Sequence, residues 1–276
     1  MKSTKKLFMV ASLAVGLFLS AAATLRAGAY HLTLGLQTYT CRNMTFDEVV
    51  DFAVKHKIKY LEMFSKHMDP FAPVEETKRK KEILDKHGLV CYTFGVNRTS
   101  MDKEQNRKLF EFAKLMGIKL IVVEPKDMAE WDNLEALVKE YDIKLAIHNH
   151  GINSTYGNPE TVKKVLSERD PRIGVCLDVG HLTSAGFDAA KTFREYNGRV
   201  YDIHLKDKKA EVVDGKKTER DVIIGTGDTD YNAFFAEVIK AKWDGVMAIE
   251  TDNSDYAKAP GVFVTAASKY VGGYRP

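Results

Sequence analysis

The segment Val175-Cys176-Leu177-Asp178-Val179-Gly180-His181 decides how the rest of this chain is interpreted. A short apolar run ends on Asp178, and His181 follows three residues later, beyond a glycine. A carboxylate at the end of a buried strand, with an imidazole in the adjoining loop, suits a divalent metal facing a cleft. The same aspartate could simply cap the helix that follows. Taken alone, the segment leaves both interpretations open.

Three other apolar runs of the chain also end on potential metal ligands. They are residues 144–148 (KLAIH), 200–204 (VYDIH) and 246–250 (VMAIE). The carboxyl ends of parallel strands in a barrel meet at one face, where active sites are normally built. We therefore expect His148, Asp178, His204 and Glu250 to converge. Since side chains alternate along an extended chain, His150 should lie on the same side as His148.

Short strand-like runs alternate with amphipathic stretches along the whole chain after residue 30. The expected strands are residues 32–38, 58–63, 89–96, 118–124, 143–148, a run ending at 178, 199–204 and 245–250. Successive units recur at about 25 to 31 residues, the length of a strand–helix unit. Eight such units predict an α/β fold, a single (β/α)₈ TIM barrel over residues 30–276. A doubly wound sheet is the alternative, but no glycine-rich phosphate turn follows the first strand.

The N-terminus has the order of a secretory signal peptide. Lysines at positions 2, 5 and 6 precede an apolar stretch over residues 7–19, and Ala27-Gly28-Ala29 offers a cleavage site. The apolar stretch is too short for a comfortable membrane span. The sequence therefore predicts a signal peptide over residues 1–29. We expect a periplasmic or secreted protein with no stable membrane insertion after cleavage.

Composition excludes several classes of function. Residues 1–29 carry four basic and no acidic side chains, so their removal changes the net charge from +3 to −1. A nearly neutral chain offers no electrostatic basis for binding nucleic acid. Two of the three cysteines, Cys91 and Cys176, lie in apolar strand-like runs. We predict neither a disulfide framework nor thiol catalysis.

The expected ligands point to a particular chemistry. Mixed nitrogen and oxygen ligands suit Mn²⁺, Co²⁺, Zn²⁺ or Fe²⁺ better than Ca²⁺. Such a cation could polarise a carbonyl and stabilise an enediolate while a neighbouring side chain moves the α-proton. The candidates for that catalytic work are Glu124, His150, His181 and Lys206. The candidates for substrate binding are Gln37, Tyr39 and Glu62.

Several motifs carry a resemblance to a known family. They are residues 35–39 (GLQTY), 176–181 (CLDVGH), 202–207 (DIHLKD), 225–228 (GTGD) and 248–250 (AIE). Together they resemble the xylose-isomerase-like barrel superfamily of sugar isomerases and epimerases. The resemblance implies a single metal bound by a glutamate, an aspartate, a histidine and a glutamate from strands five to eight. Asp178, His204 and Glu250 match the last three, whereas His148 replaces the first, so that His148 or Glu124 completes the set.

The resemblance implies a metal-dependent sugar isomerase or epimerase that enolises its substrate beside a carbonyl. The partner it implies is a small sugar or keto-sugar, and it says nothing of the oligomeric state. The Ile-His-Asn-His segment at residues 147–150 resembles exported members that act on 3-keto-glycosides, so a lyase or hydratase is the alternative. Two further alternatives are a sugar-binding barrel without chemistry and an apurinic-site endonuclease. The endonuclease would need more histidines at strand ends than this sequence supplies.

Overall fold

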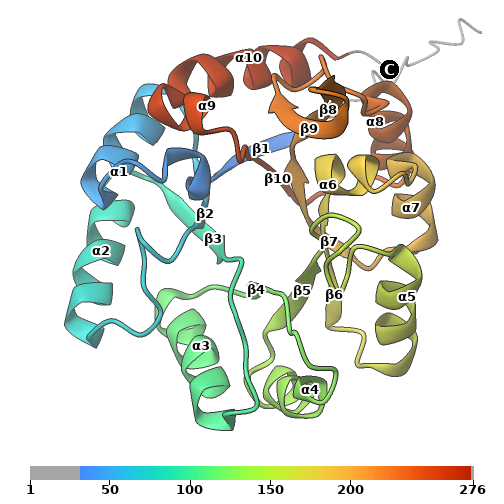
Figure 1. Ribbon diagram of the computed structural model, residues 1–276. Coiled ribbons are helices and arrows are strands. Elements are labelled where there is room, and N and C mark those ends of the chain that lie inside the picture. The colour runs from blue at the N-terminus through green and yellow to red at the C-terminus, as the bar shows by residue number, and fades with distance from the viewer. Residues whose placement is uncertain (1–31, 275–276) are drawn as a thin grey trace, which may run out of the picture. The chain divides into compact units, whose positions relative to one another are not determined.

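The computed structural model describes residues 32–274, and their strands and helices alternate around a barrel (Figure 1). The eight parallel strands are β1 (Thr33–Gln37), β2 (Tyr60–Met63), β3 (Val90–Phe94), β4 (Leu120–Val123), β5 (Lys144–His148), β6 (Ile173–Asp178), β7 (Val200–Leu205) and β10 (Val246–Ile249). Their order is β3-β2-β1-β10-β7-β6-β5-β4, so the first strand pairs with the last. The predicted TIM barrel is confirmed.

Helices surround the strands. They are α1 (Phe46–Lys55), α2 (Val74–Lys86), α3 (Lys103–Met116), α4 (Glu130–Tyr141), α5 (Pro159–Glu168), α6 (Val179–Ser184), α7 (Ala189–Glu195), α8 (Tyr231–Lys240), α9 (Ser254–Lys258) and α10 (Pro260–Gly273), with a short 3₁₀ helix, η1 (Thr38–Cys41). Side-chain caps mark where several of them begin. At α1, Thr45 accepts a hydrogen bond from the backbone N–H of Glu48, and the Glu48 carboxylate accepts one from the N–H of Thr45. This reciprocal pair satisfies two N–H groups that the helix leaves free.

Burial explains why the strands could be recognised as apolar runs. Every residue of β6 is buried, because helices cover one side of the strand and the barrel interior covers the other. Val122, Ala146 and Cys176 form a small apolar cluster of their own, with Leu120 packed against it. The catalytic end of β6, Asp178, is therefore held by a strand with no exposed residue.

The barrel closes between β3 and β4 through one residue. Asn97 pairs with Val123 in an isolated parallel bridge. Its N–H donates to the carbonyl of Val122 at 3.0 Å, and its carbonyl accepts from the N–H of Glu124 at 3.2 Å. Gly95 permits this approach, because a Cβ at that position would lie 2.6 Å from the Cβ of Val122. The closure fixes the two segments that follow β3 and β4.

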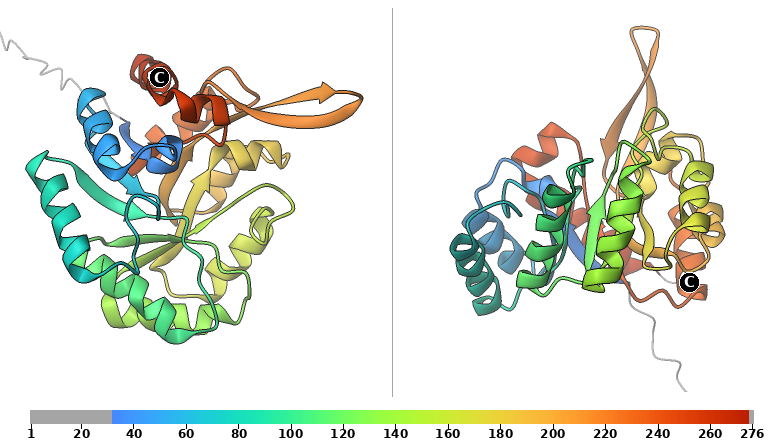
Figure 2. Two further views of the ribbon diagram at one scale, coloured as in Figure 1. Left: turned by 60° about the vertical axis from the view of Figure 1, so that its left-hand side comes forward. Right: turned by 90° about the horizontal axis from the view of Figure 1, so that it is seen from below.

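A β-hairpin stands between residues 204 and 245, where no strand was expected. Strands β8 (Asp207–Val213) and β9 (Lys216–Val222) pair antiparallel between β7 and α8, and they project from the barrel (Figure 2). Asp214 and Gly215 form the turn with φ angles of 51° and 74°. An Asp-Gly pair with both φ angles positive is typical of a two-residue hairpin turn. The list of expected strands was therefore incomplete, and Asp214-Gly215 was the sequence signal for the missing pair.

Three further expectations concern the signal peptide, membrane insertion and the cysteines. The predicted signal peptide, residues 1–29, lies outside the described residues. Within residues 32–274, the structure contains no helix with the length and apolar character needed to cross a membrane. Cys41, Cys91 and Cys176 are free thiols in the described part of the chain.

Candidate active site

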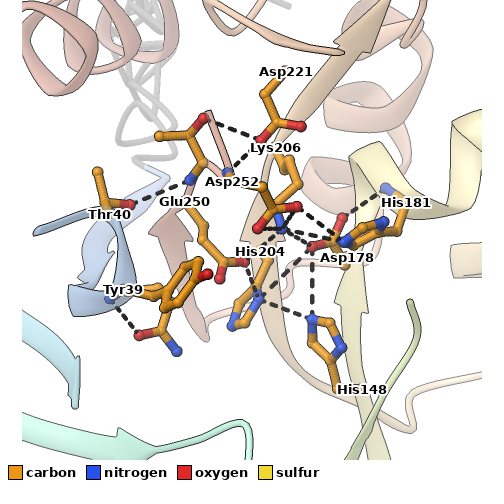
Figure 3. Close-up of polar contacts among 12 residues, drawn as sticks. Tyr39, Thr40, His148, Asp178, His181, His204, Lys206, Asp221, Glu250 and Asp252 are labelled. Atoms are coloured by element: carbon orange, nitrogen blue, oxygen red, sulfur yellow. Dashed lines mark hydrogen bonds and ion pairs between the residues drawn. The ribbon is translucent and has the colours of Figure 1, made fainter. Parts of the chain in front are cut away.

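Four side chains from four strands meet at the carboxyl end of the barrel (Figure 3). His148 and Asp178 end β5 and β6, His204 lies near the end of β7, and Glu250 directly follows β10. Nδ1 of His204 lies 2.8 Å from Oε2 of Glu250, 3.2 Å from Nε2 of His148 and 3.9 Å from Oδ2 of Asp178. One potential ligand atom of each residue lies within 4.8 Å of the others. The structure thus brings the four expected ligands together.

The polar atoms of this group fit a bound cation. Asp178 Oδ2 and Glu250 Oε2 are buried, and neither makes a hydrogen bond to any described residue. Each lies 3.1 Å from Nζ of Lys206, and Asp252 contacts the same ammonium at 3.1 Å. Three carboxylates therefore meet at one ammonium, and among the described residues only Asp252 lies near a second one, 3.6 Å from Nζ of Lys208. Two imidazole nitrogens and two carboxylate oxygens are also the donor set that suits a divalent transition metal.

Three of the four ligand groups, His148, Asp178 and Glu250, have the protonation state that metal binding requires. Burial lowers the pKa of His148 to about 4, so its imidazole is neutral at neutral pH. Burial alone would raise the pKa of Glu250, but Lys206 and His204 lower it to about 2. Against the same effect of burial, Lys206 holds the pKa of Asp178 well below its usual value. Burial alone would lower the pKa of His204, but nearby acidic groups, Glu62 and Glu250 among them, hold it well above its usual value, so His204 carries a proton that a cation would displace. Neutral imidazoles and ionised carboxylates are the forms that coordinate metals.

A buried carboxylate sets the orientation of His204. Nε2 of His204 donates to Oε2 of Glu62 at 2.7 Å, and Tyr92 donates to the neighbouring Asp202 at 2.9 Å. Burial raises the pKa of Glu62 to about 8, so this pair retains a shared proton at neutral pH. Nδ1 of His204 is then directed at the ligand group, 2.8 Å from Oε2 of Glu250, as is usual for histidine ligands backed by a carboxylate. Glu62 is fully buried and does not line the cavity, so the structure does not place it where a substrate-binding residue would lie.

Asp178 acts both as a helix cap and as a potential metal ligand, the two interpretations that its sequence segment left open. Its Oδ1 accepts a hydrogen bond from the N–H of His181 at 2.7 Å and caps α6, while Oδ2 faces the ligand group. The Asn149 side chain bonds both backbone groups of Asp178, at 2.9 and 3.0 Å. The sequence did not single out Asn149, although it lies between the two expected histidines. One carboxylate therefore begins a helix and presents a ligand atom.

Cys176 is a competing ligand that its own chemistry disfavours. Together with His148 and His204 it forms a second group with potential for metal binding. Burial raises the pKa of Cys176 well above its usual value. A protonated thiol is a poor ligand. The set with two carboxylates is the better metal site.

A second functional pair lies beside the ligand group. Glu124 follows β4 and His150 follows β5, and Oε2 of Glu124 lies 2.6 Å from Nδ1 of His150. Burial alone would lower the pKa of His150, but the Glu124 hydrogen bond and charge raise it. Burial would likewise raise the pKa of Glu124, and the contact with His150 lowers it. The two groups form an anion–cation pair, and both line a cavity of about 820 Å³.

The cavity places the remaining expected residues differently. Gln37 and Tyr39 both line it. The Gln37 amide is already occupied, because it donates to the carbonyl of Gly95 at 3.1 Å and accepts from the N–H of Tyr39 at 3.0 Å. Gln37 therefore shapes the cavity wall. The sequence did not single out several lining residues that follow the barrel strands, namely Phe64, Phe71, Arg98, Lys126 and Asp252.

Lys206 and His181 lie behind the ligand group and do not line the cavity. Nζ of Lys206 donates to both carboxylate oxygens of Asp252 at 3.1 Å. Nε2 of His181 lies 3.3 Å from Lys206 Nζ and 3.3 Å from Asp252 (Figure 3). Both residues can therefore act on the ligand group through their charge, and neither is in contact with the space that a substrate would occupy in this cavity. Asp252 could have been found from the sequence, because it lies two residues beyond Glu250.

Comparisons with known proteins agree with this geometry. An inosose dehydratase of Clostridium perfringens (strain 13) is 27% identical over 240 residues, covering 72% of this chain and 80% of that protein. An uncharacterised protein of Parabacteroides distasonis has a solved structure with a TM-score of 0.67 and 27% identity, covering 88% of this chain and 98% of that chain. The solved structure of the IOLI protein, with a bound zinc atom, has a TM-score of 0.69 at 18% identity and covers 87% and 99% of the two chains.

The names of these relatives agree with the predicted class of enzyme, a sugar isomerase or a lyase of the same superfamily. The third comparison shows the fold alone, because its sequence identity is low. A match to a family covers residues 50–268, which is most of the barrel. The chain belongs to the xylose isomerase-like TIM barrel family.

Proposed function

We propose that this protein is a metal-dependent lyase that enolises a keto-sugar and then eliminates a substituent next to the enolised carbon. The observation that carries the proposal is the Glu124–His150 pair at 2.6 Å, which is the acid–base pair of the cavity wall. The strand-five position holds His148, which is buried and does not line the cavity, and whose pKa is lowered to about 4, so it is a weak base that a substrate in the cavity does not reach. The dehydratase names of the curated relatives support the same choice.

The pair can carry both proton movements of an elimination. The carboxylate of Glu124 accepts the proton from the carbon beside the carbonyl as that C–H bond breaks. The imidazolium of His150 donates its proton to the departing oxygen as the C–O bond breaks and a C=C bond forms. The pair begins as an anion and a cation and ends as two neutral groups, so no further acid or base is needed.

The ligand group provides the binding site for the cation that would act as the electrophile of this reaction. His148, Asp178, His204 and Glu250 would hold a divalent cation, and such a cation supplies polarisation of the substrate carbonyl. Lys206 keeps the adjacent carboxylates ionised, and Glu62 keeps Nδ1 of His204 directed at the ligand group. Elemental analysis of the purified protein would identify the metal among Mn²⁺, Co²⁺, Zn²⁺ and Fe²⁺.

Isomerisation or epimerisation is the second candidate. Glu250 also lines the cavity, so a second carboxylate reaches the substrate. If Glu250 returned the proton before a substituent left, the same enolised substrate would give an isomer. The two outcomes differ in whether the substituent is released.

The test uses metal-loaded protein and the 3-keto-glucoside of 4-nitrophenol in deuterium oxide. We expect release of nitrophenol, followed by its absorbance, and loss of release in Glu124→Gln. Deuterium uptake without release would instead support the isomerase. Glu82→Gln is the matched control, because Glu82 lies exposed on α2, and it should behave as the wild type. If no deuterium is taken up and no nitrophenol is released with any of the four metals, enolisation is refuted.

We also propose that the protein is exported. The basic, apolar and small-residue order of residues 1–29 supports this. Sequencing the N-terminus of the protein from the cell envelope or medium is the test. A mature chain that begins at Tyr30 is expected, and an intact N-terminus in the cytosolic fraction would contradict export.

A further inference from the structure

Two of the three lysine and arginine side chains on the cavity wall make no polar contact with the described residues. Arg98 and Lys126 both line the cavity, and neither makes an ion pair or a side-chain hydrogen bond with any residue from 32 to 274. Lys66, the third cation of the wall, differs because its Nζ donates to the carbonyl of Arg42 at 2.6 Å. Uncompensated positive charge inside a cavity raises the local concentration of anions.

The acidic groups of the same cavity are already occupied. Glu124 contacts His150 at 2.6 Å, and Glu250 contacts His204 at 2.8 Å. Asp252 contacts Lys206, and Asp69 accepts a hydrogen bond from the N–H of Phe71. The groups left without partners on this wall are therefore positive, although the ligand group beneath is negative.

The structure holds the two cations in fixed segments. Arg98 directly follows Asn97, the residue that closes the barrel between β3 and β4. The next residue, Thr99, donates a hydrogen bond to one carboxylate oxygen of Glu130. The other oxygen of Glu130 accepts from the N–H of Asp127 at 3.0 Å, directly after Lys126. Glu130 is buried at 4% exposure and so ties together the two loops that carry the cations.

We propose that Arg98 and Lys126 form a binding subsite for an anionic group of the substrate, a carboxylate or a phosphate monoester. Arg98 offers planar paired donors and Lys126 a point charge, and both chemistries recognise such anions. The aromatic side chains Tyr39, Phe64 and Phe71 line the same cavity and offer an apolar surface to the remainder of the substrate. The substrate class is thus a keto-sugar with an acidic substituent. This inference rests on the proposed function only for the keto-sugar part.

The test compares three 3-keto-glucosides on the metal-loaded protein. Their substituents are 4-hydroxybenzoate, its neutral methyl ester and 4-hydroxyphenyl phosphate. Binding is measured by calorimetry in the Glu124→Gln background, where turnover is blocked, and substituent release is measured in the wild type. Release reports on the proposed reaction and binding reports on the subsite, so the two can fail separately.

We expect at least one anionic glucoside to bind about tenfold or more tightly than the methyl ester, since hydrogen bonds between charged groups are the strong ones. Arg98→Ala combined with Lys126→Ala should remove that preference and leave binding of the ester unchanged. Lys119→Ala is the matched control, because Lys119 lines a different cavity, at the amino ends of the strands. It should keep the full preference.

Three results would overturn the subsite. They are equal binding of the anionic and neutral compounds, no binding of either anion, and an unchanged preference after both cations are removed. Tighter binding of the phosphate than of the carboxylate identifies a phosphate subsite, and the reverse order identifies a carboxylate subsite. Both outcomes support the proposal. Higher salt should weaken the preference, because exposed charges are screened.

Discussion

At the scale of single residues, Glu62 controls the metal site without lining the cavity. It accepts the Nε2–H of His204, and so keeps Nδ1 of His204 directed at Glu250. We expect Glu62→Gln to weaken metal binding about tenfold or more, as is usual when a partner of a ligating histidine changes. Metal titration with a competing chelator measures the effect. Unchanged affinity, with the fold intact by circular dichroism, would show that His204 does not need this partner.

The sequence predicted which residues meet in the site but not how each is used. Asp178, His204 and Glu250 end strands, and strand ends converge in a barrel, so their meeting followed from periodicity. The division of work within Asp178, where Oδ1 caps α6 and Oδ2 faces the ligand group, depends on a side-chain rotamer. The position of Glu62 depends on burial between strands, which the pattern at the end of β2 does not reveal.

His67 gives the protein a measurable dependence on pH. Burial lowers its pKa to about 4; Nδ1 lies 3.0 Å from the Thr38 hydroxyl and Nε2 lies 3.2 Å from the carbonyl of Met44. The carbonyl of Met44 can only accept, so Nε2 of the neutral imidazole donates to it and Nδ1 accepts from the Thr38 hydroxyl. The oxygen of Thr38 in turn accepts from the N–H of Phe64. In the unfolded chain the histidine becomes protonated below about pH 6.5, whereas in the folded chain His67 stays neutral down to about pH 4.

Stability should therefore fall as the pH falls through that window, by up to about 3 kcal/mol. Urea unfolding of the wild type and of His67→Gln at pH 7 and pH 5 tests this. The variant should lose less stability between the two pH values than the wild type. An equal loss in both proteins would remove His67 as the cause.

At the scale of elements, the base of the hairpin is tied to the active site. Asp221 of β9 accepts hydrogen bonds from the hydroxyl of Thr251 at 3.0 Å and the N–H of Asp252 at 2.6 Å. Asp252 in turn contacts Lys206. We expect Asp221→Ala to lower kcat about tenfold or more, because Asp252 and Lys206 lose their fixed positions. Replacing residues 210–219 at the hairpin tip by a short turn should leave kcat unchanged. If this replacement lowers kcat as much as Asp221→Ala does, the effect does not come from the base of the hairpin alone.

The hairpin also shows where sequence patterns fail. The strands of the barrel are buried on both sides and appear as continuous apolar runs, so most of them were predicted within about two residues of their observed bounds. Strands β8 and β9 have few buried residues, and exposed lysine, glutamate and valine side chains mix along them. Without a buried face there is no alternation to detect, and only the Asp-Gly turn remained as a signal.

At the scale of the whole molecule, closure of the barrel depends on Asn97, which no periodicity marks. Its backbone and side chain bond Val122 and Phe94 across the gap between β3 and β4. Eight strand–helix units were enough to predict a barrel, because each unit must bury one face against its neighbours. The residue that joins the third and fourth strands could not be predicted, because a loop bridge has no sequence pattern of its own.

A metal bound by four strands should also stabilise the barrel as a whole. Residues from β5, β6, β7 and the end of β10 hold the site together, so a cation that binds only the folded chain adds to the free energy of unfolding. At a free metal concentration about 1,000 times the Kd, the gain is about 4 kcal/mol. For a barrel of this size, that corresponds to about 8 to 16 °C in Tm.

We therefore expect a chelator to lower the Tm of the wild type by that order, and metal to restore it. In Glu250→Gln the shift should largely disappear, because one of the two carboxylate ligands is lost. Arg98→Ala should keep the full shift, since Arg98 lies on the cavity wall and outside the ligand group. If the purified wild type contains no metal, and neither the chelator nor added metal changes its Tm, then the four residues hold no cation in solution and neighbouring cations such as Lys206 balance the carboxylates.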